Sequence, residues 1–302
     1  MPDIASIAYL PEPAGSALAA AVARLPRGAA AVFDWDNTCI FNDIGDAAFD
    51  RALRTDDLRL APDERAALLP GPLRDGPWSA RRAEMHALYE DLETAVGATR
   101  RYEWVASLLA GRTDRDLEAL AEAAIDEGLA APLAVEVLRT GAGGGGDAGR
   151  EVRVPRGLRL YEPIVGLQRT LLAAGLDVRI VTASAAPLVR AFARRAGLDP
   201  DRVIGVRLDR DPATGRLLPR ALSPFPYAEG KVAAIDRFIG RRPALVAGDS
   251  PGDLPMLRAA THTRLVIERD PRSEAARVAR AEGWLVVRAE ELLGPASAST
   301  SP

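Results

Sequence analysis

The chain has 302 residues, which is enough for one large domain or two modest ones. Hydrophobic residues make up 48% and charged residues 27%, a balance typical of a globular protein with a sizeable core. The net charge of −3 gives no overall attraction to nucleic acid or to an anionic membrane, so neither is expected as a partner. The single cysteine, Cys39, excludes an internal disulfide. Since no secretory signal or membrane-length apolar run is recognised, we expect a soluble cytoplasmic protein.

The first half of the chain is predicted to be mainly helical. A helix over 16–24 and a buried strand over 29–33 come first, and the strand ends abruptly at Asp34. A helical pattern then continues almost to residue 138, with predicted helices at 43–54, 62–69, 78–96, 100–109, 114–127 and 133–139. Thr113 followed by Asp116 predicts the N-terminal cap of one of these helices. A glycine-rich loop is expected at 141–149 and a flexible tail at 295–302.

After the glycine-rich loop, helices and strands alternate. Helices are predicted at 163–174, 187–196, 229–239 and 273–281, and strands at 178–182, 244–247, 264–267 and 284–287. A β-hairpin is predicted with arms at 203–208 and 216–221. Because alternating strands and helices favour parallel pairing, the predicted fold class is α/β, with a Rossmann-like parallel-sheet core. The core would be formed by 1–41 and 157–294, the helical insertion would be 42–156, and the hairpin would be an extension.

Two pairs of carboxylates follow predicted strands, where open parallel sheets place their ligand sites. Asp34 and Asp36 can face one crevice, so that one attacks a substrate while the other moves a proton. Asp249 and Asp253 lie on a glycine-containing turn and can hold a hard cation such as Mg²⁺. Taken alone, each pair could equally be an acidic turn after a strand.

Two further positions offer donors for phosphate oxygens. Thr182, followed by Ser184, ends a predicted strand with hydroxyl groups, although strands often end in this way. Lys231 lies in the first turn of a predicted helix and is the only lysine among the 39 basic residues. A compact ammonium at this place suggests a need that arginine cannot meet, since the chain otherwise uses arginine throughout. On position alone, the chance survival of one lysine on a helix surface is an equal alternative. A cation at a helix N-terminus also opposes the helix dipole unless an anion lies nearby.

The four clusters in this order resemble the haloacid dehalogenase superfamily of aspartate-nucleophile phosphatases. The resemblance covers the α/β core and implies that Asp34 is the nucleophile and Asp36 the general acid and base. It also implies a Mg²⁺ ion held by Asp34, the backbone carbonyl of Asp36, Asp249 and Asp253, where Asp253 either supports the metal indirectly or pairs with Lys231. Asp36 favours phosphate-ester hydrolysis over dehalogenation, because a halide needs no proton on leaving.

The same resemblance implies a substrate site. Thr182, Ser184 and Lys231 would bind the phosphoryl group of a small phosphorylated metabolite. The closest likeness is to the phosphoserine phosphatase and phosphorylcholine phosphatase branch, in which an acidic residue near Asp43 would hold an amino group. The helical insertion, which the resemblance implies is a cap over the active site, contains four aromatic residues that could form a wall against a choline-like cation or simply the core of the cap: Trp78, Tyr89, Tyr102 and Trp104. Alternative functions are phosphotransfer from the aspartyl-phosphate to an acceptor other than water, and a non-catalytic regulatory module.

Overall fold

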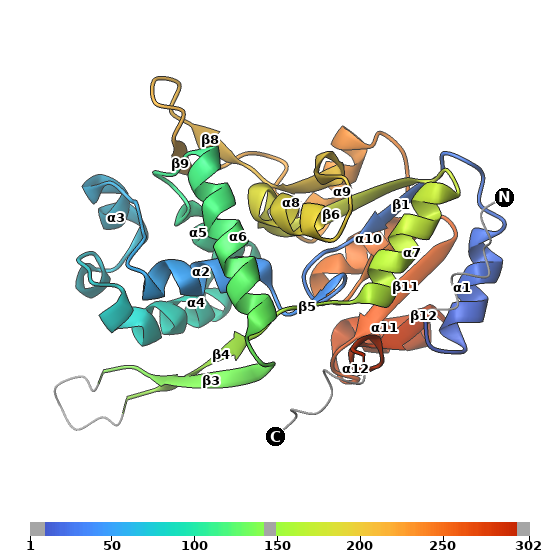
Figure 1. Cartoon of the computed structure of the whole chain (residues 1–302), viewed down its shortest axis with the longest axis horizontal. Helices are drawn as coiled ribbons and strands as arrows, with labels where there is room; N and C mark the ends of the chain where they lie inside the picture. Colours follow the sequence, from blue (N-terminus) through green and yellow to red (C-terminus); the bar gives the residue numbers. More distant parts are fainter. Residues whose placement is uncertain (1–9, 142–148, 295–302) are drawn as a thin grey trace. The chain divides into compact units, whose positions relative to one another are not determined.

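The computed structural model describes residues 10–141 and 149–294 and contains two compact units (Figure 1). The sheet unit comprises the described parts of Met1–Asp43, Arg159–Gly205 and Pro224–Pro302. The inserted unit comprises the described parts of Ile44–Leu158, together with Val206–Ser223. Within the described ranges, no helix has both the length and the apolar character needed to cross a membrane.

The sheet unit is built on six strands in the order β12-β11-β10-β1-β6-β7, which confirms the predicted α/β fold with a parallel sheet. In chain order the strands are β1 (Ala30–Phe33), β6 (Asp177–Ala185), β7 (Val203–Val206), β10 (Leu245–Gly248), β11 (Thr263–Glu268) and β12 (Leu285–Arg288). A separate antiparallel pair is formed by β2 (Ile40–Phe41) and β5 (Arg159–Leu160). Strand β1 lies between β6 and β10, with Phe33 opposite Ile180 on one side and Ala247 on the other. The carboxyl ends of these three strands therefore meet at one edge of the sheet.

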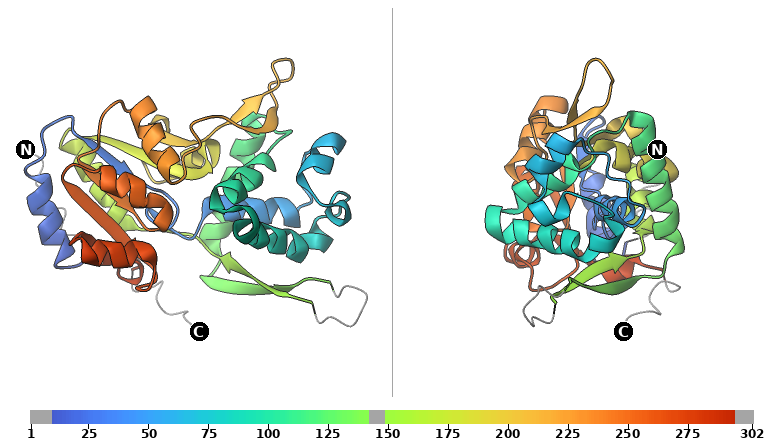
Figure 2. Two further views of the ribbon diagram at one scale, coloured as in Figure 1. Left: turned by 180° about the vertical axis from the view of Figure 1, so that it is seen from behind. Right: turned by 90° about the vertical axis from the view of Figure 1, so that its left-hand side faces the viewer.

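Helices cover the sheet. They are α1 (Ala14–Val22), α7 (Glu162–Ala173), α8 (Ala186–Arg195), α9 (Glu229–Phe238), α10 (Leu254–Ala259), α11 (Glu274–Ala281) and α12 (Ala289–Leu292), with short 3-10 helices at Pro200–Arg202 and Pro251–Asp253. Val32 and Val246 belong to a fully buried cluster with residues of α9, α10 and α11. Successive side chains of a strand point to opposite faces, so Ala31 and Phe33 face the other layer, where α7 lies (Figures 1 and 2).

The predicted hairpin over 203–221 is wrong in its first arm. Strand β7 joins the central sheet beside β6, and only β8 (Leu208–Arg210) pairs with β9 (Leu217–Ala221). The short apolar run Val203–Val206 matches a strand buried in a parallel sheet, and the hairpin begins after it. The second arm also bonds within the inserted unit, since the Leu217 amide donates to the Arg112 carbonyl (2.9 Å) and the Gly111 amide donates to the Leu217 carbonyl (2.8 Å).

The inserted unit contains helices and two hairpins. Its helices are α2 (Ile44–Arg54), α3 (Pro62–Leu68), α4 (Arg82–Val96), α5 (Ala98–Ser107) and α6 (Asp114–Ala130), with 3-10 helices at Gly71–Leu73 and Ser79–Arg81. The Thr113 cap is confirmed, because its hydroxyl accepts a hydrogen bond from the Asp116 amide at the start of α6.

The helix predicted over 133–139 is wrong. These residues form β3 (Ala134–Arg139), which pairs antiparallel with β4 (Glu151–Arg156). Val135 and Val137 alternate with polar or half-buried neighbours, which is the period of a strand, and β4 alternates in the same way. Of the predicted glycine-rich loop between these strands, residues 142–148 lie outside the described residues, as does the predicted tail at 295–302.

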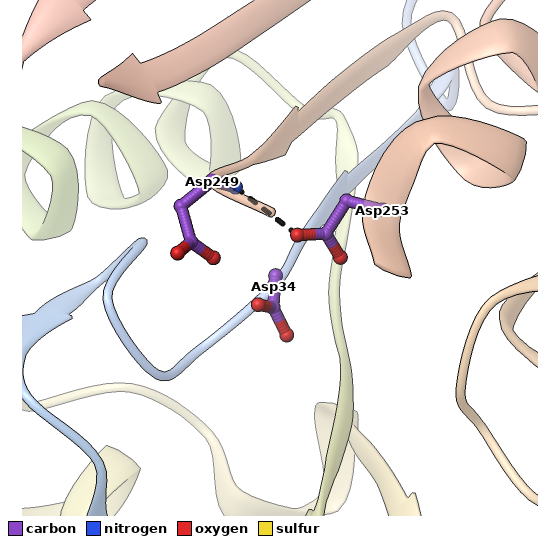
Figure 3. A group of neighbouring side chains, drawn as sticks. All are labelled: Asp34, Asp249 and Asp253. Carbon is purple, nitrogen blue, oxygen red and sulfur yellow. Dashed lines mark hydrogen bonds between the residues drawn. The ribbon is translucent and has the colours of Figure 1, made fainter. Parts of the chain in front are cut away.

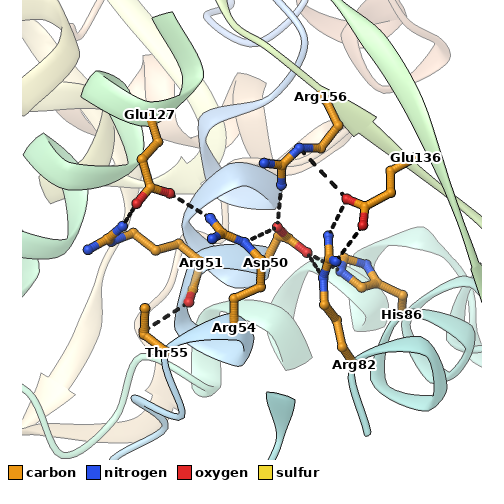
Figure 4. Close-up of polar contacts among 9 residues, drawn as sticks. All are labelled: Asp50, Arg51, Arg54, Thr55, Arg82, His86, Glu127, Glu136 and Arg156. Atoms are coloured by element: carbon orange, nitrogen blue, oxygen red, sulfur yellow. Dashed lines mark hydrogen bonds and ion pairs between the residues drawn. The ribbon is translucent and has the colours of Figure 1, made fainter. Parts of the chain in front are cut away.

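A charged cluster centred on Asp50 holds the interior of the inserted unit (Figure 4). The Asp50 carboxylate is 3% exposed and accepts hydrogen bonds from Arg54 (3.0 Å), Arg82 (2.6 Å) and Arg156 (2.9 Å), and it lies 2.9 Å from His86 Nε2. These partners come from α2, α4 and β4. Although burial opposes ionisation, the hydrogen bonds from His86 and Arg82 lower the pKa of Asp50, so the cluster ties the hairpin to the helices through a buried negative charge.

Candidate active site

Polar residues gather at the carboxyl edge of the sheet, where β1, β6 and β10 end. Asp34 directly follows β1, and Asp249 directly follows β10. Thr182 and Ser184 lie near the carboxyl end of β6. The parallel register places these positions on adjacent strands, as the sequence predicted for an open sheet. Thus segments more than 200 residues apart supply a common site.

Lys231 lies between two carboxylates in the interior of the sheet unit. Its Nζ donates to Asp34 Oδ1 at 2.7 Å and to Asp253 Oδ1 at 2.6 Å, and the lysine side chain is almost fully buried. Burial alone would favour the neutral amine, but the charges of Asp253 and Asp34 reverse this effect and raise the pKa of Lys231. The lysine is therefore held charged against the side chain predicted to be the nucleophile.

The second oxygen of Asp253 organises the turn after β10. Asp253 Oδ2 accepts hydrogen bonds from the Asp249 amide (3.1 Å), the Ser250 amide (3.0 Å) and the Ser250 hydroxyl (3.0 Å). Both oxygens of Asp253 are thus already engaged by the protein. Asp253 serves here to hold Lys231 and to shape the turn that presents Asp249.

Two glycines allow this close packing. A Cβ at Gly248 would lie 2.6 Å from Asp253 Cβ, and a Cβ at Gly230 would lie 1.8 Å from the Phe225 carbonyl oxygen. Neither distance is sterically possible, so the turn after β10 and the start of α9 both depend on glycine. Ala228, just before α9, has φ 49° and ψ −122°, a conformation that favours glycine, so the approach to Lys231 is also strained.

Three carboxylates lie close enough to share a cation (Figure 3). One oxygen each of Asp34, Asp249 and Asp253 falls within 4.8 Å of the others. Burial, reinforced by the charge of Asp253 and opposed by Lys231, raises the pKa of Asp34 from 3.8 to about 7. Burial and the charges of Asp253 and Asp34 also raise the pKa of Asp249 well above its ordinary range.

This donor set suits a hard divalent cation. Mg²⁺ prefers carboxylate and other oxygen ligands, and a positive ion would relieve the repulsion that raises the pKa values of Asp34 and Asp249. Asp34 and Asp249 are the carboxylates best placed to bind directly, because the oxygens of Asp253 are bonded to Lys231 and to the turn. The Asp36 side chain lies outside this acidic group, and its expected contribution to the metal is through the backbone.

The Asp36 carboxylate instead meets the hydroxyl groups of β6. The Ser184 hydroxyl donates to Asp36 Oδ2 at 2.7 Å, and the Thr182 hydroxyl lies 3.4 Å from the same oxygen. Asp36 is 8% exposed, and the chain turns tightly around it, with Asn37 in the left-handed region that asparagine tolerates (φ 57°). The two residues predicted to bind substrate on β6 therefore contact the predicted general acid.

Some residues at the site were not assigned a role from the sequence. The Thr38 hydroxyl lies 3.4 Å from Asp249 Oδ1, and Ser250 supports Asp253. Arg269, which follows β11, is exposed, has no ion-pair partner among the described residues, and lowers the pKa of Asp249 through its charge. Thr38 closely follows the Asp34 and Asp36 pair, and Ser250 lies between Asp249 and Asp253, so their positions in the sequence could have indicated both residues. Only the strand order brings Arg269 near the site.

The residues expected to recognise an amine are Asp43 and four aromatic residues of the helical insertion. Asp43 is half-buried and directly precedes α2, at the end of the first segment of the sheet unit. Of the cap aromatics, Tyr89 and Trp104 pack with Phe49, and Arg101 lies over the rings of Tyr89 and Tyr102. Similarly, Arg65 lies over the buried Trp78 ring. Trp78, Tyr89 and Trp104 are thus buried residues of the inserted unit, and arginines of that unit lie over the rings of Trp78, Tyr89 and Tyr102.

The parallel sheet, the Asp34–Lys231–Asp253 arrangement and the acidic turn after β10 occupy the positions that the family resemblance implied from the sequence. A sequence model of the haloacid dehalogenase-like hydrolases matches residues 31–258, and the chain belongs to this family. No curated protein matches the chain in a sequence search.

Solved structures share the fold. A conserved protein of unknown function from Anaerococcus prevotii DSM 20548 has a TM-score of 0.71 and 23% identity, covering 92% of this chain and 93% of that one. A protein of unknown function from Bordetella pertussis Tohama I has a TM-score of 0.59 and 21% identity, covering 88% and 100%. Cytosolic 5′-nucleotidase IIIB bound to cytidine has a TM-score of 0.51 and 12% identity, covering 95% and 90%. At these identities the likeness is one of fold.

Proposed function

We propose that the protein is a Mg²⁺-dependent phosphatase that hydrolyses a small phosphomonoester through an aspartyl-phosphate on Asp34. The observation that carries this proposal is the buried Asp34 carboxylate, which is held at 2.7 Å by the ammonium of Lys231 and lies beside Asp249. Family membership and the shared fold with a nucleotidase support phosphate-ester chemistry.

The residues divide the chemistry between them. An oxygen of Asp34 attacks phosphorus, the bond to the ester oxygen breaks, and Asp36 gives that oxygen a proton. A water molecule then loses a proton to Asp36 and attacks the same phosphorus, which releases phosphate and restores Asp34. Lys231 offsets the negative charge of the phosphoryl oxygens in both steps. Mg²⁺ bound by Asp34 and Asp249 would supply further charge neutralisation at the phosphoryl group.

The substrate class is a small phosphomonoester, and an amine-bearing one such as phosphorylcholine, phosphoethanolamine or phosphoserine remains the specific hypothesis for Asp43. Its carboxylate follows the segment that carries Asp34 and Asp36, where it could meet a substrate cation. The arginine-covered aromatics give this hypothesis no cation–π support. If Asp43 recognises an amine, Asp43→Asn should weaken a cationic substrate far more than a neutral one, whereas equal loss for both would refute the hypothesis.

The reaction itself is tested with purified protein, Mg²⁺ and a panel of several dozen phosphomonoesters, with phosphate release as the readout. Wild-type protein should release phosphate, and Asp34→Asn, which is nearly isosteric, should not. Beryllium fluoride with Mg²⁺ should raise the Tm of the wild type and leave Asp34→Asn unchanged. Release by the Asp34→Asn variant would overturn the assigned nucleophile. Stimulation of turnover by added alcohols would favour phosphotransfer over hydrolysis.

A further inference from the structure

Strand β6 brings two hydroxyl groups to the same carboxylate oxygen. β6 continues from Ile180, which is opposite Phe33 of β1, to Ala185. Thr182 and Ser184 are two residues apart in this strand, so their side chains project from the same face. Both hydroxyls reach Asp36 Oδ2, Ser184 at 2.7 Å and Thr182 at 3.4 Å. The Ser184 bond is the shorter and therefore the stronger of the two.

Ser184 also fixes its neighbour. Its backbone amide donates to Thr182 Oγ1 at 3.0 Å, which uses a lone pair of that hydroxyl and leaves its proton to be donated toward Asp36 Oδ2 at 3.4 Å. The backbone of Ser184 is itself closely packed, since a Cβ at Gly205 of β7 would lie 2.7 Å from the Ser184 carbonyl oxygen. One residue thus controls both hydroxyls that face Asp36, and its own position is set by the neighbouring strand.

We propose that Ser184 is a positioning residue for Asp36, rather than a direct ligand of the phosphoryl group. This inference rests on the proposed phosphatase reaction, in which Asp36 transfers a proton to the leaving oxygen. A serine has a single hydroxyl proton, and here that proton is donated to Asp36 Oδ2. An oxygen that accepts this hydrogen bond is the less favourable place for a second proton. The transferable proton of Asp36 therefore lies on its other carboxyl oxygen, and Ser184 sets which way the acid faces.

The inference distinguishes substrates by their leaving groups. An alkyl phosphate releases a strongly basic alkoxide and needs a proton from Asp36, whereas p-nitrophenyl phosphate releases a weakly basic phenolate that does not. For Ser184→Ala we expect kcat/KM to fall about 10- to 100-fold for an alkyl phosphate, within the range of general acid catalysis, and less than about 3-fold for p-nitrophenyl phosphate. Ser184→Thr, which keeps a hydroxyl on the strand, should restore most of the alkyl activity.

A double-mutant cycle tests whether Ser184 acts through Asp36. With Mg²⁺ and the alkyl phosphate, Ser184→Ala should cause no further loss of kcat/KM in an Asp36→Asn background, because the group it positions is gone. The inhibition constant of inorganic phosphate should be unchanged by Ser184→Ala. The Tm of each variant, measured alongside, separates loss of folding from loss of function.

Three results would overturn the inference while leaving the proposed function in place. The first is an equal loss of kcat/KM for both substrates in Ser184→Ala with weaker phosphate inhibition, which would make Ser184 a substrate ligand. The second is additive losses of Ser184→Ala and Asp36→Asn in the double-mutant cycle. The third is no loss of kcat/KM for either substrate. If the folded wild-type protein with Mg²⁺ releases phosphate from neither substrate, the proposed function itself fails and the role of Ser184 falls with it.

Discussion

Replacing Asp34 by asparagine should stabilise the metal-free protein and abolish its activity at the same time. In the folded protein, burial and the neighbouring Asp253 raise the pKa of Asp34 from 3.8 to about 7, despite the opposing effect of Lys231. The wild-type protein must therefore ionise a carboxyl group in unfavourable surroundings at neutral pH. An asparagine keeps the shape and an acceptor for Lys231 without this cost.

The sign and size of the stability difference between Asp34→Asn and the wild type follow from proton linkage. Because the folded-state pKa lies above the unfolded value, the folded state binds the proton more tightly, and this stabilisation is complete below pH 3.8 and lost as the pH rises through about 7. At about 1.4 kcal/mol per pKa unit, a shift from 3.8 to about 7 corresponds to roughly 4 kcal/mol at pH 8. The free energy of unfolding of Asp34→Asn should exceed that of the wild type by up to this amount at pH 8, and by almost nothing near pH 4.

Thermal and urea unfolding of both proteins in a chelating buffer, from pH 4 to pH 8, measures this difference. Asp236→Asn, at an exposed position of α9, makes the same charge change as a control and should not follow the trend. Added Mg²⁺ should stabilise the wild type increasingly as the pH rises, since cation and proton compete for Asp34, and should stabilise Asp34→Asn much less. Equal or lower stability of Asp34→Asn at pH 8, without a pH trend, would refute the electrostatic account of the site.

Three further substitutions test other parts of the structure. Lys231→Arg keeps the charge but should lower kcat/KM about 100-fold or more. A planar guanidinium cannot replace an ammonium held at 2.7 and 2.6 Å from two buried carboxylates. Near wild-type turnover would contradict this reasoning. Ala228→Gly should raise the free energy of unfolding in urea by about 1 kcal/mol by relieving the backbone at φ 49°, whereas a loss of stability would show that the strain is absent. Asp50→Asn should lower it by about 3 kcal/mol, because three arginines lose a buried counter-charge, and a change below about 1 kcal/mol would mean that the cluster is dispensable.

The alternation of strands and helices was sufficient to predict the parallel sheet. Buried strands such as Ala30–Phe33 are recognisable because a short apolar run is followed at once by a polar residue. Two elements could not be predicted in this way. Residues 133–139 are short enough to suit either a helix or a strand, and the choice is made by pairing with residues 151–156 across the glycine-rich segment. Similarly, a strand was predicted over 203–208, but the pairing of Val203–Val206 with β6 instead of with a hairpin arm is a contact that no local pattern records.

At the candidate site, the sequence could indicate which residues gather but not which atoms bond. Strand ends that share an edge bring Asp34, Asp249 and the hydroxyls of β6 together, and this follows from topology alone. The pairing of Lys231 with both Asp34 and Asp253 was one of two alternatives for Asp253, and side-chain geometry selects it. The contact of Ser184 with Asp36 depends on how far β6 extends, which the predicted strand at 178–182 underestimated.

The charges of the site explain why a divalent cation suits it better than a monovalent one. The three carboxylates of Asp34, Asp249 and Asp253 carry three negative charges when ionised, and Lys231 offsets one of them. Two negative charges remain, which a single divalent ion balances and a monovalent ion does not. Without a cation, bound protons neutralise part of this negative charge, as the raised pKa values of Asp34 and Asp249 indicate. In the proposed reaction, a proton on Asp34 blocks the oxygen that attacks phosphorus, so the ion that balances the charge would also free the proposed nucleophile.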